Sequence, residues 1–200
     1  MAAHRNNNDL DLITMNADGP HIAGNASKRK NAILNLVTRR KPHLIFFQEY
    51  KLAMNLWKRD EIKRKYTYIG SNGNSASILY DKNKLTCTSS FYTQKQTEGQ
   101  GVIQWYPTIN HEDVDLINFI NSSLDINEHR LCMSKMTRKD VEPVQHFICI
   151  SWHGPHRVTD PNKVIVLNKL LQTANGIFTE FNIPVIIGGD FNISNEEVDQ

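Results

Sequence analysis

Cysteine is scarce in this sequence. The 200 residues include only Cys87, Cys132 and Cys149. Their odd number and wide spacing argue against a disulfide framework or a metal site built on thiolates. Each stands among apolar or β-branched neighbours, so we expect buried free thiols and a reducing compartment.

Long apolar runs are also missing. No stretch approaches the roughly 20 apolar residues of a membrane span, and the polar start, residues 1–9, lacks the apolar core of a signal peptide. No short repeat, low-complexity segment or linker divides the chain. We therefore expect no membrane partner, a cytoplasmic or nuclear location, a disordered segment over residues 1–9 and one domain over residues 10–200.

The net charge is only +2, yet the charge is unevenly spread. Residues 1–100 hold 16 Lys and Arg against 8 Asp and Glu, a net charge of +8, whereas residues 101–200 hold 7 against 13, a net charge of −6. The basic clusters lie at 28–30, 39–41, 58–59 and 63–65. This basic half would suit a polyanion such as nucleic acid, although solvated helix faces explain each cluster taken singly.

The first part of the chain predicts a strand, a helix and a second strand. Residues 10–15 are typical of a strand, Ser27 is placed to cap a helix that Pro42 stops, and residues 43–48 form a short apolar run suited to a buried strand. The helix is expected to bury Ile33, Leu36 and Val37.

The remaining elements follow from similar patterns. Residues 54–65 are weakly helical, short strands over 66–70, 75–80 and 85–91 predict an antiparallel meander, and residues 111–124 have helical spacing. A hairpin over 130–136 and 145–151 precedes a long helix over 162–181 and a buried strand over 183–187. The expected apolar stripe of the long helix consists of Val164, Leu167, Leu171, Ala174, Phe178 and Phe181.

Polar side chains follow four of these predicted strands. They are Asn16 and Asp18, then Glu49, then His153, then Asp190 and Asn192 after the Gly188-Gly189 turn. A turn former, an exposed strand end, a core histidine or a cap would explain each one alone. Because all of them lie at the carboxyl ends of apolar strands, we expect one shared site.

The residue types restrict the chemistry of such a site. Carboxylates and carboxamides are hard oxygen ligands, which suit Mg²⁺ or Mn²⁺, whereas zinc would require more histidine or cysteine. A phosphate ester bound to that ion, with a water molecule activated by Asp190, would make a coherent hydrolytic site.

Four segments resemble successive motifs of the endonuclease/exonuclease/phosphatase superfamily, most closely its deoxyribonuclease I branch. They are Met15-Asn16-Ala17-Asp18-Gly19, Gln48-Glu49, Ser151-Trp152-His153-Gly154-Pro155 and Gly188-Gly189-Asp190-Phe191-Asn192, in the order of that family. The resemblance implies an α+β fold, a four-layer α/β/β/α sandwich of two packed mixed β-sheets flanked by helices.

The resemblance also implies residue roles. Glu49 would be the main metal ligand, with Asn16 and Asp18 completing or orienting the metal site.

The remaining residues implied by the resemblance would act on the substrate. Asp190 would orient or deprotonate the attacking water, and Asn192 would hold a phosphate oxygen. His153 would donate a proton to the leaving oxygen or stabilise the phosphoryl charge. Arg130 is similar in position to a phosphate-contacting arginine of the deoxyribonuclease branch.

Parts of the family pattern are missing. The sequence has no counterpart of the final Ser-Asp-His motif or of the aspartate before it, and no acid stands near Asn74 or Ser75 to support His153. We therefore expect a C-terminally incomplete sandwich with an exposed edge, a complementing segment or chain, and little or no hydrolysis by these 200 residues alone.

Three functions are consistent with the sequence. The first is a Mg²⁺-dependent phosphodiester hydrolase, an endonuclease that cuts DNA or RNA by in-line attack of water. The second keeps the chemistry but acts on inositol phosphates or phospholipids. The third is a non-catalytic domain that binds nucleic acid or protein.

Overall fold

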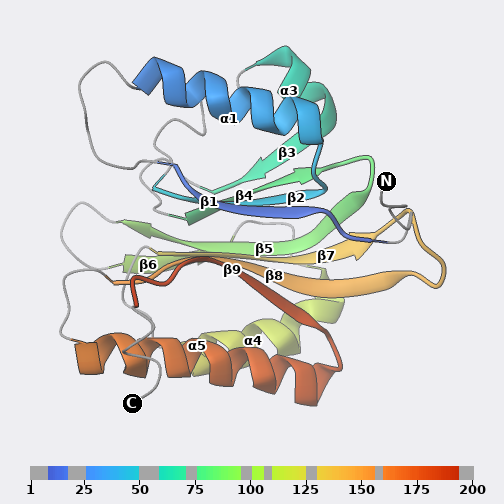
Figure 1. The fold of residues 1–200 in the computed structure, drawn as a ribbon. Helices are drawn as coiled ribbons and strands as arrows, with labels where there is room; N and C mark the ends of the chain where they lie inside the picture. The colour runs from blue at the N-terminus through green and yellow to red at the C-terminus, as the bar shows by residue number, and fades with distance from the viewer. Residues whose placement is uncertain are drawn as a thin grey trace, which may run out of the picture.

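Two β-sheets packed face to face form the centre of the computed structural model, and helices cover both outer faces (Figure 1). The structure describes residues 9–17, 26–49, 59–70, 76–95, 101–105, 110–124, 130–155 and 160–193. The predicted α/β/β/α sandwich is therefore confirmed. The predicted N-terminal segment lies outside the described residues, apart from Asp9.

The first sheet has the strand order β1-β2-β4-β3, with β1 parallel to β2 and the other neighbours antiparallel. Its strands are β1 (Leu12–Asn16), β2 (Leu44–Gln48), β3 (Tyr66–Ile69) and β4 (Ala76–Asp81). Helices α1 (Ala26–Arg40) and α3 (Asp60–Lys65) lie on the side of this sheet that faces away from the second sheet (Figure 1).

The second sheet has the order β6-β5-β7-β8-β9, with β8 parallel to β9 and the other neighbours antiparallel. Its strands are β5 (Leu85–Lys95), β6 (Gly101–Trp105), β7 (Leu131–Arg138), β8 (Gln145–His153) and β9 (Val185–Asp190). A 3₁₀ turn (His111–Asp113), α4 (Val114–Ser123) and α5 (Asp160–Phe181) complete the chain, and the two helices cover the outer face of this sheet.

The predicted meander is wrong at its third strand. β3 and β4 pair as expected, but β5 pairs with β6 and β7 in the second sheet. The other edge of β4 is already taken by β2, which pairs with it along five residues. The turn after Asp81 therefore carries the chain from one sheet to the other.

Both long helices are rotated relative to the predicted faces. In α1, Leu34 is buried with Ile33 and Val37 while Leu36 is 36% exposed, and Ser27 lies within the first turn rather than before it.

In α5 the buried residues are Leu170, Thr173 and Ile177, one position away from the predicted Leu171 and Phe178, which are exposed. Two apolar stripes compete in this helix, and packing selects between them. A Cβ atom on Gly176 would lie 2.4 Å from the Phe119 ring of α4, so this glycine allows close approach on the face that is buried.

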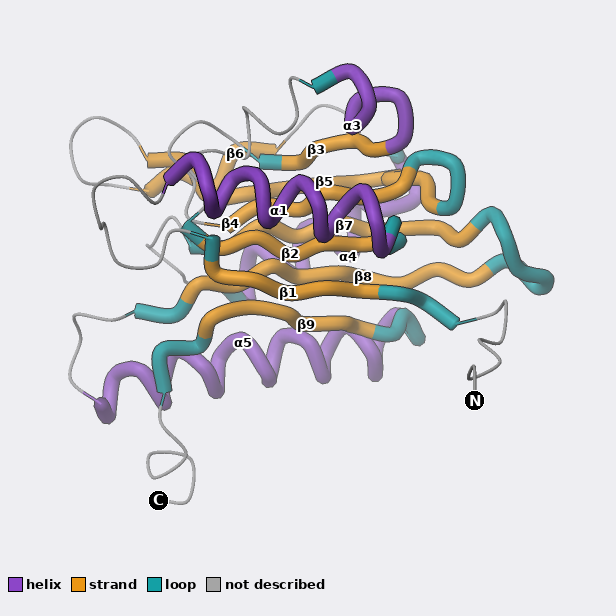
Figure 2. Tube along the Cα trace, turned by 45° about the horizontal axis from the view of Figure 1, so that its top comes forward, coloured by secondary structure: helices purple, strands orange, loops and turns teal. Residues whose placement is uncertain are grey.

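Among the described residues, no further element covers the side of the sandwich formed by β1 and β9. Both are edge strands, they lie side by side, and neither contains Lys, Arg or Pro, the residues that commonly protect sheet edges (Figure 2). Leu12 on β1 is 40% exposed, whereas its register partner Leu44 on β2 is fully buried.

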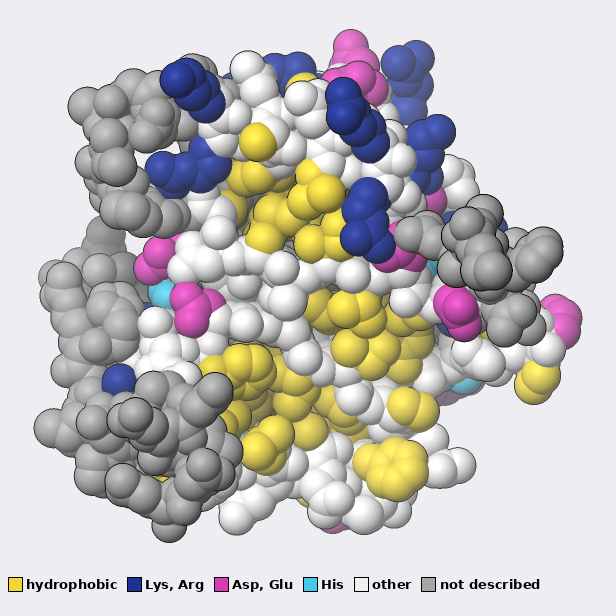
Figure 3. Space-filling view, viewed as in Figure 1, with side chains coloured by type: hydrophobic (Ala, Val, Ile, Leu, Met, Phe, Trp, Pro, Cys, Tyr) yellow, Lys and Arg dark blue, Asp and Glu magenta, His cyan; other side chains and the backbone are white. Residues whose placement is uncertain are grey.

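A cavity of about 460 Å³ opens beside Leu10 and Ile186 at this edge, and apolar side chains reach the surface there (Figure 3). The expected exposure of an edge and part of the core is thus present, whereas β9, predicted as a buried strand, is mostly half-buried.

The three cysteines are free thiols, as predicted. Cys132 and Cys149 are fully buried between the sheets and Cys87 is half-buried beside them. Burial raises the pKa of all three thiols, which keeps them protonated and unreactive. In the described part of the chain, no helix combines the length and the apolar composition needed to cross a bilayer.

Leu12→Ala and Leu44→Ala test whether the edge is open in solution. Urea unfolding should show a loss of about 3 to 5 kcal/mol in the free energy of unfolding for Leu44→Ala, because a sealed cavity forms. Leu12→Ala should lose only about 1 kcal/mol, because part of this side chain already contacts water. Equal losses would mean that another polypeptide covers β1.

Candidate functional site

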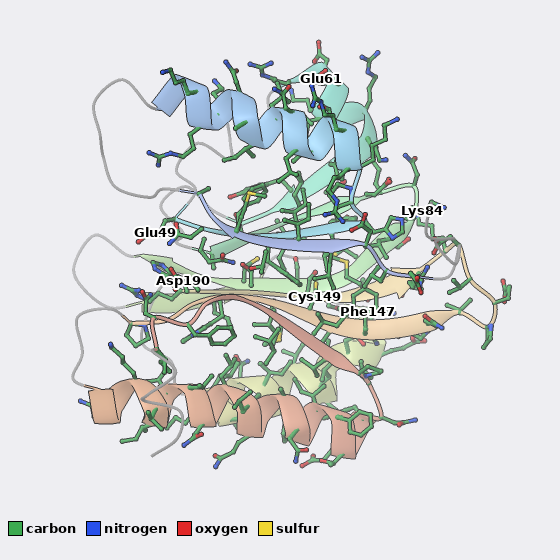
Figure 4. All side chains as sticks on the ribbon, in the orientation of Figure 1. Glu49, Glu61, Lys84, Phe147, Cys149 and Asp190 are labelled. Atoms are coloured by element: carbon green, nitrogen blue, oxygen red, sulfur yellow. The ribbon has the colours of Figure 1, made fainter. Side chains whose placement is uncertain are left out.

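The predicted site residues meet where four strands end. Asn16 is the last residue of β1, Glu49 follows β2, His153 ends β8 and Asp190 ends β9. The two strand pairs are parallel, so their carboxyl ends coincide, and the register pairs His153 with Asp190. Figure 4 shows Glu49 and Asp190 at this same end of the sandwich.

Asp190 is held by hydrogen bonds on both of its carboxylate oxygens. The Asn16 side chain Nδ2 donates to Oδ2 at 2.8 Å, which joins β1 of the first sheet to β9 of the second. The backbone N–H of Asn192 donates to Oδ1 at 3.1 Å. Each carboxylate oxygen can accept more than one hydrogen bond, so the oriented carboxylate can still accept one from water.

His153 and Glu49 form a second contact between the sheets. Nε2 of His153 lies 3.3 Å from Oε1 of Glu49. The histidine side chain is only 3% exposed, whereas the Glu49 side chain is 33% exposed. The histidine therefore supports the glutamate from the interior, and the glutamate faces the solvent side of the site.

Buried polar bonds fix β2 against β8 beneath this contact. Gln48 Nε2 donates to Ser151 Oγ at 3.2 Å, and that hydroxyl donates to the Phe47 carbonyl at 3.1 Å. We did not predict this role for Gln48 and Ser151. The signal that marks them is a polar residue within a strand that is otherwise apolar.

The Gly154 carbonyl is the meeting point of two predicted phosphate-binding residues. Nη1 of Arg130 donates to this oxygen at 2.6 Å, and Nδ2 of Asn192 donates to it at 2.7 Å. The Gly154 N–H donates to the Asp190 carbonyl at 2.6 Å, and a Cβ here would lie 2.1 Å from the Phe191 carbonyl oxygen. Only glycine fits at this position, so it sets the placement of Asn192.

Two site residues have strained backbones. Glu49 and Asn192 both have φ of 53°, a region that non-glycine residues rarely adopt. Lys41 and Asn182 share this conformation, but each follows a helix and donates its N–H to that helix's carbonyls, the usual helix end. Glu49 and Asn192 instead follow strands, and strain of this kind is frequent at functional sites.

A cleft of about 660 Å³ lies over these strand ends. It is lined by Thr14, Met15, Asn16, Gln48, Gly189, Asp190, Phe191, Asn192 and Ile193. Asp18, predicted near the metal, lies outside the described residues, as do Asn74 and Ser75. The structure therefore brings together five predicted residues, Asn16, Glu49, His153, Asp190 and Asn192, with Arg130 bonded to their Gly154 neighbour.

The donor set fits a hard divalent cation. The side-chain carboxamide oxygen of Asn16 and the carboxylates of Glu49 and Asp190 are oxygen donors. Mg²⁺ commonly takes one or two carboxylates and several waters. Within the described ranges, no three His, Cys, Asp or Glu side chains form a group that could hold a metal ion, so a cation here would need water molecules and the Asn16 carboxamide oxygen as further ligands. The sequence prediction of Mg²⁺ or Mn²⁺ is consistent with these residues and stays a prediction.

Asn182→Gly and Asn192→Gly form a matched pair, because the two asparagines share one backbone conformation. Glycine relieves the positive φ in both, which should raise the free energy of unfolding of Asn182→Gly by about 0.5 kcal/mol. Asn192→Gly also loses the bond to Gly154, so it should be about 1 kcal/mol less stable than Asn182→Gly in urea unfolding. Equal stability would show that this bond does not hold Asn192.

Known proteins supply an independent comparison. Neither the protein-family models nor the curated protein sequences that were searched gave a match to the chain. Solved structures do match it. D. rerio TDP2 complexed with single-strand DNA product has a TM-score of 0.60 at 17% identity, covering 95% of this chain and 63% of that one.

Two bacterial structures match equally well. An endonuclease/exonuclease/phosphatase protein from Bacteroides vulgatus and a mannosyl-6-phosphatase from Bacteroides thetaiotaomicron each have a TM-score of 0.62 at 16% identity, covering 94% of this chain and 67% of theirs. The chain thus spans about two thirds of the length of these structures. From its layers, its strand order and these matches, the chain has the endonuclease/exonuclease/phosphatase fold of the deoxyribonuclease I type.

Proposed function

We propose that this chain carries the site of a Mg²⁺- or Mn²⁺-dependent phosphodiester hydrolase, a nuclease that cuts DNA or RNA internally. The observation that carries this proposal is the Asn16 to Asp190 hydrogen bond, which brings the predicted metal side and the predicted water-activating side of the site together. If Asp190 only capped the turn that follows β9, it would not need a hydrogen bond to the edge strand of the other sheet.

Each described residue has a part in the proposed reaction. The cation, when bound near Glu49 and Asn16, supplies positive charge that neutralises the phosphate. Asp190, with its carboxylate oriented by two hydrogen bonds, positions the attacking water and accepts its proton. Asn192 holds a phosphate oxygen with the second N–H of its carboxamide, since one N–H already donates to the Gly154 carbonyl.

His153 stabilises the charge at the site through Glu49. The Nε2 atom of His153 faces Glu49. His153 would therefore have to break its contact with Glu49 before it could give a proton from Nε2 to the leaving oxygen. The buried position of the ring favours the charge-stabilising role over direct proton donation.

We further propose that full activity requires a complementing polypeptide segment over β1 and β9. The support is the open edge, where Leu12 and five of the six β9 residues remain partly exposed, and the one-third of the matched structures that has no counterpart in this chain. Hydrolysis by the 200 residues alone should therefore be weak.

A supercoiled plasmid detects such weak activity, because a single cut converts it to the open circle. With the protein in excess, we expect slow nicking in Mg²⁺ or Mn²⁺, none in EDTA, and a decrease of about 100-fold or more in Asp190→Asn. Asp115→Asn, an exposed aspartate on α4, is the matched control and should keep the parent rate.

The same preparation separates the alternatives. The mannosyl-6-phosphatase match favours a small phosphoester as the second candidate substrate, so phosphate release from sugar and inositol phosphates is measured in parallel. Release from those substrates with no nicking would replace the nuclease proposal. DNA binding without turnover of any substrate in either metal would instead identify a non-catalytic binding domain.

A further inference from the structure

Helix α1 is unusually one-sided in charge. It contains Lys28, Arg29 and Lys30 near its start and Arg39 and Arg40 in its last turn, and no Asp or Glu. The opposite layer differs: α4 has no Lys or Arg, and the two lysines of α5 are balanced by Asp160 and Glu180. Dark-blue basic side chains accordingly gather over the α1 and α3 layer in Figure 3.

The cations at the start of α1 oppose the helix dipole. The amino-terminal end of a helix carries partial positive charge and favours acidic residues, and this helix has none in its first turn. No acid elsewhere in α1 can offset the cluster through a contact one turn away. Folding of the helix therefore does not require the Lys28 and Lys30 cations here, whereas an external anion would favour them.

The start of α1 is fixed beside the candidate site. Nη1 of Arg29 donates to the Ala17 carbonyl at 3.3 Å, and Ala17 directly follows Asn16. The Ala17 N–H in turn donates to the Gln48 carbonyl, next to Glu49. Lys28 and Lys30 flank Arg29 around the helix, so their flexible side chains extend from a point held against the strand ends.

The basic cluster at the other end of α1 does not share this position. A 15-residue helix is roughly 22 Å long, so residues 39–41 are far from the strand ends that form the site. Arg40 is also paired with Asp11 at 3.2 Å. The two clusters were equivalent in the sequence, and the fold places only residues 28–30 at the site.

We propose that Lys28 and Lys30 bind backbone phosphates of a nucleic-acid strand that extends from the phosphate at the Asp190 site to the start of α1, with Arg29 positioning the helix end. This inference rests on the proposed function and makes its substrate a polymer, because the strand would have to pass from the end of β9 in the second sheet across the first sheet to the start of α1 on its outer face. Phosphate contacts carry no base information, so the cluster sets affinity rather than sequence preference.

Fluorescence anisotropy with a labelled 20-nucleotide single-stranded DNA, in EDTA, tests this without hydrolysis. The double variant Lys28→Gln/Lys30→Gln should weaken binding about tenfold at 50 mM salt and reduce the slope of log K against log salt by about 1.4, the value for two phosphate contacts on a single strand. Its melting temperature should not fall, because the lost cations oppose the helix dipole.

Lys82→Gln/Lys139→Gln is the matched control. It removes the same charge from exposed lysines at the opposite end of the strands and should leave both affinity and slope unchanged. Equal effects of the two double variants would overturn the proposal, since they would show only a general response to net charge.

The binding and nicking assays together separate failure of the phosphate-contact proposal from failure of the proposed hydrolase function. If Lys28→Gln/Lys30→Gln alone weakens binding while no variant or metal gives nicking, the phosphate contacts stand and the hydrolase proposal fails. If nicking depends on Asp190 but the two double variants bind DNA alike, the hydrolase stands and these contacts are wrong.

Discussion

The site depends on the alignment of two parallel strand pairs, one in each sheet. β1 and β2 end together, β8 and β9 end together, and the hydrogen bond from Asn16 to Asp190 joins these ends across the sandwich. Antiparallel pairing at either place would send one of the polar ends to the opposite side of the molecule. The buried Gln48 to Ser151 bond holds the two inner strands in the same alignment.

Most of the fold, and the placement of the candidate site residues at strand ends, could be predicted from local patterns. Apolar runs located β1, β2, β8 and β9 closely enough to place Asn16, Glu49, His153 and Asp190 at strand ends, because a strand's length and its polar end are both encoded locally. The sequence could not show which strands pair when two pairings fit the pattern equally well. The crossing of β5 to the second sheet depends on β2 taking the edge of β4.

Side-chain contacts across the sandwich were also beyond sequence reasoning. The rotation of α5 is decided by the approach of Phe119 to Gly176, and the positions of Arg130 and Asn192 by a shared carbonyl at Gly154. Such contacts join residues that are distant in the sequence. They also show how the open edge and the site are linked, because β1 and β9 provide both the exposed edge and two of the site's central residues.

In the proposed function, Glu49, Asn16 and Asp190 form one cation-dependent site. Crystals grown with Mn²⁺ test it most directly, through the anomalous scattering of the ion. We expect one strong peak within coordination distance of the Glu49 carboxylate, beside Asn16, that disappears in Glu49→Gln. A saturating Mn²⁺ concentration that gives no peak there, or a peak only at another acidic side chain, would contradict it.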